Sequence, residues 1–224
     1  MIILPIITAV LCGVAFFLML RDISEHRELF LTCNDTNSPR LLSRGAVIYS
    51  IILVIITVAA SVLFCTIYKE NGILMSIKRL ALLSMLWPIA YIDYKTYRIP
   101  NAFIVLGLGY RGIILALELI LSSQTVWPTV LGELVAAGAL FLASVLCSLI
   151  TKNAIGFGDV KLFILMGLML GMDGIWGSVF LSLIVSFFIS VYVLITKKKT
   201  RKDTIPFGPA IVIGTYLSVC LSGV

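Results

Sequence analysis

The sequence predicts an all-α, polytopic membrane protein of about eight transmembrane helices. Apolar residues make up 60% of the 224 residues and charged residues only 12%, and the mean hydropathy is +1.12. A soluble domain needs a polar face toward water, and this composition leaves too little polar surface for one. Apolar runs of about 20 residues recur along the chain, which is the length of a helix that crosses a bilayer.

Eight apolar segments account for these helices. They are expected at about 1–20, 46–68, 73–92, 102–121, 129–150, 160–172, 175–196 and 208–222. The first lacks a basic start and a small-residue cleavage site, so we interpret it as a retained anchor. The polar stretch 21–45 is too short for a domain and predicts a loop or a surface helix. Residues 171–174, Gly-Met-Asp-Gly, are typical of a tight turn between the sixth and seventh segments.

Basic residues gather in alternate loops, which indicates how the helices are oriented. Of the 17 lysines and arginines, 13 fall in four such loops, and loops of this kind face the cytoplasm. They are Arg21, Arg27, Arg40, Arg44, Lys95, Arg98, Lys152, Lys161, Lys197, Lys198, Lys199, Arg201 and Lys202. The sequence therefore predicts a multi-pass cell (inner) membrane protein with an outside N-terminus. The net charge of +6 then reflects topology and contact with the lipid bilayer, not nucleic-acid binding.

Two aspartates are the main candidates for chemistry. Asp93 and Asp159 each fall where an apolar segment meets a polar loop, and the predicted topology puts both at the cytoplasmic face. A carboxylate at such a place is costly unless it is used. Two close aspartates would share one proton, so that one activates water while the other protonates a peptide carbonyl. This chemistry needs no metal or other cofactor, and the five cysteines have no spacing typical of a zinc site.

Two glycines and a lysine surround the second aspartate. Gly156 and Gly158 allow a substrate backbone to approach closely, and Lys161 is a candidate to orient a carboxylate. The same Gly-x-Gly-Asp pattern also fits a loop with an acidic helix cap, and Lys161 also fits a marker of the membrane edge. Both interpretations remain open from the sequence.

Two further polar stretches precede predicted helices. Residues 93–101 are expected to form a compact polar loop in which Pro100 and Asn101 lead into the next helix. Pro206 and Pro209, on either side of Gly208, predict a stiff, non-helical entry to the last helix.

These blocks together resemble the type IV prepilin peptidase family of Gly-x-Gly-Asp membrane aspartic proteases. The resemblance rests on Asp93 with Ile99-Pro100-Asn101, on residues 156–162, and on Pro206-Phe207-Gly208-Pro209. It implies a six-helix peptidase core over residues 73–224, preceded by two transmembrane helices with a cytoplasmic loop over residues 1–72. It also implies that Asp93 and Asp159 are the catalytic pair, with the other named residues shaping the site or binding substrate.

The resemblance further implies a reaction and partners. The expected reaction is cleavage of the leader peptide from prepilin or pseudopilin precursors at the cytoplasmic membrane face, with other pilus or secretion-system proteins as further candidate partners. Large family members carry paired CxxC motifs and a methyltransferase activity. Here stretch 21–45 holds Cys33 alone, so the chain resembles a short form that cleaves without methylating.

Alternatives from other functional classes remain. Buried carboxylates also serve transporters and channels as proton relays, although no inverted repeat is evident between the two halves. A catalytically dead scaffold of a secretion system is a third possibility, disfavoured by the intact aspartates. Arg111, Glu118 and Glu133 lie inside predicted helices, and we expect a structural Arg–Glu pair there in preference to a substrate contact.

Overall fold

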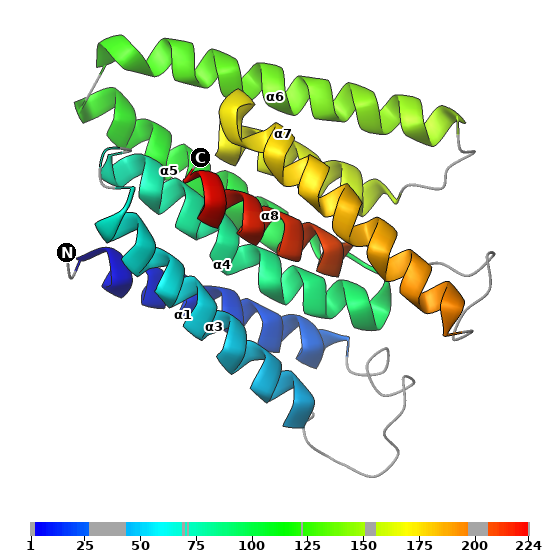
Figure 1. The fold of residues 1–224 in the computed structure, drawn as a ribbon. Coiled ribbons are helices and arrows are strands. Elements are labelled where there is room, and N and C mark those ends of the chain that lie inside the picture. The colour runs from blue at the N-terminus through cyan, green and yellow to red at the C-terminus, as the bar shows by residue number, and fades with distance from the viewer. Residues whose placement is uncertain are drawn as a thin grey trace.

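The protein is built from α-helices, as predicted. The computed structural model describes residues 3–26, 44–68, 70, 72–121, 123–150, 156–196 and 206–223, and no strand occurs within them. Figure 1 shows the helices packed as one elongated bundle. They are α1 (Ile3–Glu25), α3 (Arg44–Thr66), α4 (Ile73–Thr96), α5 (Asn101–Leu121), α6 (Ser123–Ile150), α7 (Phe157–Ile195) and α8 (Gly208–Ser222). Six are long and apolar enough to cross a membrane; α8, with 15 residues, is shorter.

Helix α7 contains both the sixth and the seventh predicted segments. Its backbone leaves the helical region only at Gly171, where φ is 65° and ψ is −172°, a conformation open essentially to glycine alone. The turn predicted over residues 171–174 is therefore a break of one residue, because a single glycine can redirect the chain. We call residues 157–170 the first half of α7 and residues 172–195 the second half; the chain turns back between them (Figure 1).

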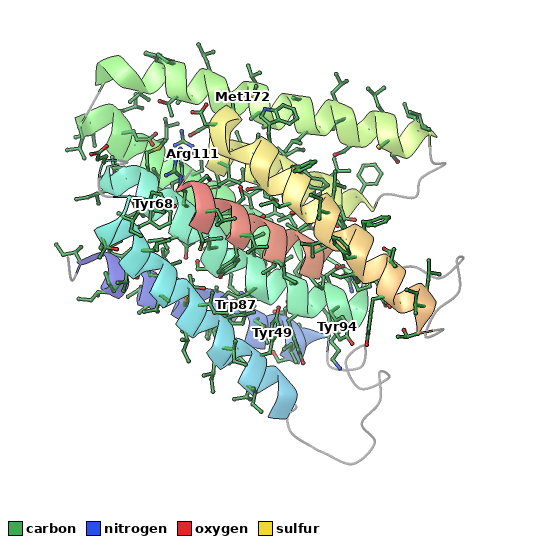
Figure 2. The ribbon with its side chains drawn as sticks, in the orientation of Figure 1. Tyr49, Tyr68, Trp87, Tyr94, Arg111 and Met172 are labelled. Carbon is green, nitrogen blue, oxygen red and sulfur yellow. The ribbon has the colours of Figure 1, made fainter. Side chains whose placement is uncertain are left out.

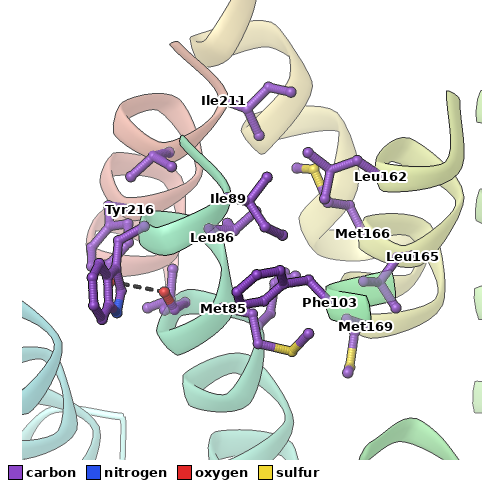
Figure 3. Close-up of a cluster of buried hydrophobic side chains, with 14 of the residues drawn as sticks. Met85, Leu86, Ile89, Phe103, Leu162, Leu165, Met166, Met169, Ile211 and Tyr216 are labelled. Carbon is purple, nitrogen blue, oxygen red and sulfur yellow. Dashed lines mark hydrogen bonds between the residues drawn. The ribbon is translucent and has the colours of Figure 1, made fainter. Parts of the chain in front are cut away.

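Helix α4 lies at the centre of the bundle. Of its apolar span, 78% is buried inside the protein, against 28% or less for each of the other five long helices. Figure 3 shows the core formed where α4 meets α5, the first half of α7, and α8. Its labelled side chains are Met85, Leu86, Ile89, Phe103, Leu162, Leu165, Met166, Met169, Ile211 and Tyr216. This packing brings together the ends of α4, α7 and α8 that carry the sequence motifs.

The N-terminal helices α1 and α3 pack on α4. Phe16 stacks on Trp87 with ring centroids 6.4 Å apart, and the Tyr49 and Tyr91 rings are 5.7 Å apart. The Tyr216 hydroxyl lies 2.5 Å from the Thr57 hydroxyl. The division of the chain at residue 72 stays a prediction.

Several helices are longer than the hydropathy pattern predicted. Helix α1 continues to Glu25, so Arg21 lies on a helix and pairs with Glu25 at 2.8 Å. Helix α4 continues to Thr96, so the loop predicted over residues 93–101 is reduced to residues 97–100. Polar residues at a helix end lower the hydropathy without stopping the backbone hydrogen bonds, which explains both differences. The rest of the stretch predicted as a polar loop, residues 27–43, lies outside the described residues.

The bundle has two distinct ends. The α4 end at Tyr94 lies opposite Arg111, Tyr68 and Met172 (Figure 2). Both termini, marked in Figure 1, lie toward the end at which Figure 2 labels Arg111. We call the end with Tyr94 the aspartate end and the other the distal end.

Candidate active site

Asp93 lies in the last turn of α4, held by the start of α8. Its side chain is buried, with 6% of the residue exposed. The backbone N–H of Gly208 donates to Asp93 Oδ2 at 2.8 Å. Because α8 begins at Gly208, this N–H is one of the unpaired donors at a helix N-terminus, where the helix dipole favours a negative charge. The Pro-Phe-Gly-Pro block is thus a backbone anchor for Asp93.

Any side chain at position 208 would crowd Asp93. A Cβ atom there would lie 2.8 Å from Asp93 Oδ2 and 3.0 Å from Asp93 Cβ, closer than side chains pack. Pro209 follows at the start of α8, where its missing N–H costs nothing because no helical partner exists there. The Phe207 ring contacts Phe163 of α7 at 5.8 Å, which joins this block to the second aspartate's helix.

Asp159 lies in the first turn of α7, where the sequence predicted it. Gly156 is the capping residue, with extended φ of −68° and ψ of 142°. Asp159 is three residues later, and its carboxylate accepts a hydrogen bond from the Gly156 backbone. This is one half of a capping box. Asp159 therefore reaches back to the cap and is not itself the capping residue, as the alternative interpretation of this motif had it.

The two aspartates lie near each other at the aspartate end of the bundle, where α8 contacts both Asp93 and α7. They are 66 residues apart in the chain, yet Asp93 lies close enough for its charge to act on Asp159. Each carboxylate accepts a hydrogen bond from the backbone of a glycine at the beginning of a helix. Chemically, such a pair can divide between its members the tasks of activating water and donating a proton.

The residues between the motifs hold the two helix ends together. Lys161 Nζ donates to Asn101 Oδ1 at 3.0 Å, which links the N-terminal part of α7 to the first residue of α5. In the described part of the chain Lys161 thus donates to an amide oxygen, and its predicted role in orienting a carboxylate stays a prediction. Gly158 lies against Ile99, since a Cβ on the glycine would be 3.1 Å from Ile99 Cβ. Pro100 precedes α5 and its carbonyl accepts from the Phe103 N–H at 3.3 Å.

Two contacts in the structure were not anticipated from the sequence. One is the Gly208 N–H on Asp93, which nothing in the local pattern indicates. The other is Lys78, whose side chain pairs with Glu133, one of the residues among which a structural Arg–Glu pair was expected. A lysine inside an apolar segment is a usable signal, because a charge in that position needs a partner.

The sequence was also compared with models of known protein families. The model of the type IV leader peptidase family matches residues 80–195, just over half of the chain, and this range includes both aspartates.

The chain belongs to the type IV leader peptidase family.

Its relatives include two curated proteins, each named prepilin leader peptidase/N-methyltransferase. The one from Bacillus subtilis (strain 168) is 30% identical over 61% of this chain and 52% of its own length. The one from Pseudomonas putida is 28% identical over 64% of this chain and 50% of its own length. The chain thus spans about half the length of the curated relatives it matches. No solved structure gives a significant match.

The match to the leader peptidase family covers only part of the candidate site. It includes Asp93, the Pro100–Asn101 pair and residues 156–161, and it ends before the Pro-Phe-Gly-Pro block. The hydrogen bond from Gly208 to Asp93 connects that block to the matched region.

Proposed function

We propose that this protein is a membrane-embedded aspartic endopeptidase that removes the leader peptide from prepilin-like precursors at the cytoplasmic membrane face. The observation that carries the proposal is the placement of Asp93 and Asp159 at the same end of the bundle, where the α8 start that holds Asp93 also packs on α7 through Phe207 and Phe163. Each aspartate is held by a glycine backbone at a helix start. Family membership and the names of the two relatives support the same reaction.

The chemistry follows from the pair. One carboxylate takes a proton from water as the water attacks the scissile carbonyl, and the other carboxylic acid protonates the carbonyl oxygen. Asp93 Oδ2 is occupied by the Gly208 N–H, which leaves its other oxygen for the water or for the shared proton. Gly156 and Gly158 have no side chain to obstruct a substrate strand, and Gly156 is exposed.

Aromatic residues support a site at the level of the lipid headgroups. Tyr94 and Tyr97 adjoin Asp93 and are 60% and 49% exposed, and Phe157 beside Asp159 is 86% exposed. Aromatic rings favour the interface between lipid and water. A prepilin-like precursor has an apolar helix in the bilayer and a basic leader in the cytoplasm, so its leader–helix junction would lie at this depth.

Charge supports the cytoplasmic orientation. Lys95, Arg98 and Lys161 all belong to the aspartate end. At the distal end, Lys78 and Arg111 are buried and ion-paired, so they do not count as loop charges in the positive-inside rule. Most of the other basic residues of the predicted cytoplasmic loops lie outside the described residues.

The geometry offers less support for a transporter. Transport sites built from broken helices lie near the membrane midplane, whereas Asp93 and Asp159 lie at one end of the bundle. The buried carboxylates of Glu118 and Glu133 are already paired with cations.

The test is co-expression with candidate prepilin-like precursors, read by gel shift and N-terminal sequencing. Wild type is compared with Asp93→Asn and Asp159→Asn, each of which keeps the side-chain shape and removes the acid. Asp173→Asn is the matched control, because Asp173 is an exposed aspartate at the distal end. We expect cleavage at the leader–helix junction with wild type and Asp173→Asn only. Cleavage that persists in either Asp93→Asn or Asp159→Asn would overturn the aspartic mechanism.

A further inference from the structure

Four buried charged residues form a cluster at the distal end of the bundle. We call Lys78, Arg111, Glu118 and Glu133 the distal cluster; they are 1%, 6%, 8% and 2% exposed. Glu133 is its hub. Lys78 Nζ donates to Glu133 Oε1, and Arg111 Nε donates to Glu133 Oε2 at 2.6 Å. Arg111 also donates to Glu118 Oε2 at 3.1 Å.

The cluster is electrically balanced, with two cations and two carboxylates. Buried charges within a membrane protein are expensive, and ion pairing offsets their desolvation only when each charge has a partner. Two of the pairs join different helices, since Glu133 of α6 contacts Lys78 of α4 and Arg111 of α5. The third pair, Arg111 with Glu118, lies within α5. Only the pairs at Glu133 therefore tie helices together.

These ties matter because α6 has little other contact with α4. Helix α6 packs chiefly against α7, and its packing against α4 and α5 is sparse. Against α7 the contact is close: a Cβ on Gly167 would lie 2.7 Å from the Cα of Ala137. Gly171, where α7 breaks, also packs against Glu133: a Cβ built at Gly171 would lie 3.6 Å from Glu133 Cγ. Helix α6 and the first half of α7 thus form one unit. The first half of α7 joins it to α4 and α5 through the apolar core, and Glu133 adds the ion pairs that tie α6 to α4 and α5 at the distal end.

That unit carries Asp159, while α4 carries Asp93. Lys78 precedes Asp93 by 15 residues of α4, or about 22 Å of helix. Asp159 precedes Gly171 by 12 residues of α7, or about 18 Å. Figure 2 shows Arg111 and Met172 at one end of the bundle and Tyr94 at the other. The distal cluster therefore secures one end of the two helices whose other ends bear the aspartates.

We propose that Glu133 is a positioning residue for the aspartate pair, acting through its ion pairs to Lys78 and Arg111. When these ties are lost, the unit of α6 and the first half of α7 tilts against α4, and the two carboxylates move apart at the other end. The catalytic part of this inference rests on the proposed function. The structural part, which we call the positional claim, is that Glu133 fixes the position of α7, and it does not depend on that function.

The positional claim is tested with a disulfide sensor beside the site. Ile99, in the short loop that joins α4 to α5, lies against Gly158 at the start of α7, with 3.1 Å between Ile99 Cβ and a Cβ built at Gly158. This is slightly below the roughly 3.8 Å of a disulfide. Ile99→Cys and Gly158→Cys are introduced together after the five native cysteines are replaced by alanine. The rate of disulfide formation then reports the position of α7 against the loop that follows α4, without altering either aspartate.

Two variants of the distal cluster are compared on this sensor. Glu133→Gln and Glu118→Gln each remove one buried carboxylate and change the charge equally, but only Glu133→Gln breaks ties between helices. We expect Glu133→Gln to slow disulfide formation about tenfold and Glu118→Gln to change it less than twofold. Equal effects of the two variants, or no effect of Glu133→Gln, would overturn the proposal. If Glu133→Gln is not recovered as a monodisperse protein in detergent, Lys78→Gln carries the same expectation.

Catalysis is the second readout, measured without the sensor cysteines. Glu133→Gln is expected to lower kcat for prepilin cleavage at least tenfold while KM changes less than threefold, because a small misplacement of reacting groups acts mainly on the chemical step. Glu118→Gln should stay within threefold of wild type in both constants. A disulfide effect in a protein whose wild type cleaves no precursor would refute the proposed function and leave the positioning role intact. Normal kcat in Glu133→Gln, with cleavage by wild type, would refute positioning.

Discussion

Replacing Gly208 with alanine tests the candidate site most directly. The added Cβ would lie 2.8 Å from Asp93 Oδ2, 3.0 Å from its Cβ and 3.2 Å from its Cγ, whereas ordinary contact begins at 3.4 Å. One partner must therefore move by about 0.6 Å. Asp93 is buried on the central helix, so the α8 start and the Asp93 side chain must separate. The 2.8 Å hydrogen bond from Gly208 to Asp93 is then weakened or lost.

The size of the effect follows from two costs. A hydrogen bond to a charged group contributes about 1.5–3 kcal/mol, and misplacing a catalytic group by about 1 Å lowers a rate by about 100-fold. We therefore expect Gly208→Ala to lower kcat/KM for prepilin cleavage by roughly 30- to 100-fold, equivalent to about 2–3 kcal/mol. The assay is cleavage of a purified precursor in detergent or vesicles, at matched enzyme amounts.

Alanine substitutions at two other glycines serve as comparisons for Gly208→Ala. Gly109 of α5 has nothing within 4 Å of an added Cβ, so Gly109→Ala should stay within about twofold of wild type. At Gly156 the nearest atom is Asp159 Oδ2 at 3.5 Å, an ordinary contact, so Gly156→Ala should fold normally. A loss of activity there would indicate contact with the substrate backbone. Wild-type kcat/KM in Gly208→Ala would refute the anchoring of Asp93 by α8.

Three further predictions concern how the helices are joined. Lys161→Met and Asn101→Ala should each lower kcat/KM by about threefold to tenfold, and together no further, since one hydrogen bond joins them; additive losses would contradict this. Gly167→Ala should lower the thermal midpoint by several degrees, because its Cβ would meet the α6 backbone at 2.7 Å; an unchanged midpoint would contradict this close packing. Tyr216→Phe should cost about 1–2 kcal/mol of stability, through lost hydrogen bonds to Thr57 and the Leu83 carbonyl, while leaving kcat unchanged. A stability equal to wild type would show that these bonds contribute nothing.

Much of the helical layout was predictable from local pattern. The apolar runs located the helices, and Gly171 was within the predicted turn. The ends were less predictable, as the extension of α4 to Thr96 shows, because a helix continues through polar residues when its backbone hydrogen bonds remain available. A structural Arg–Glu pair was expected, since charges inside apolar segments need partners; the structure pairs Arg111 with both Glu118 and Glu133.

The sequence by itself determined the helical membrane class and the position of Asp93 and Asp159 at the ends of two apolar segments. Hydropathy, helix length and the position of a charge along a helix are local properties, readable one segment at a time. Only the tertiary structure decided which helices touch. Gly208 meets Asp93 across 115 residues, and Lys78 meets Glu133 across 55. Such partners depend on how apolar faces pack against one another, and apolar faces that all look alike in sequence do not specify their neighbours.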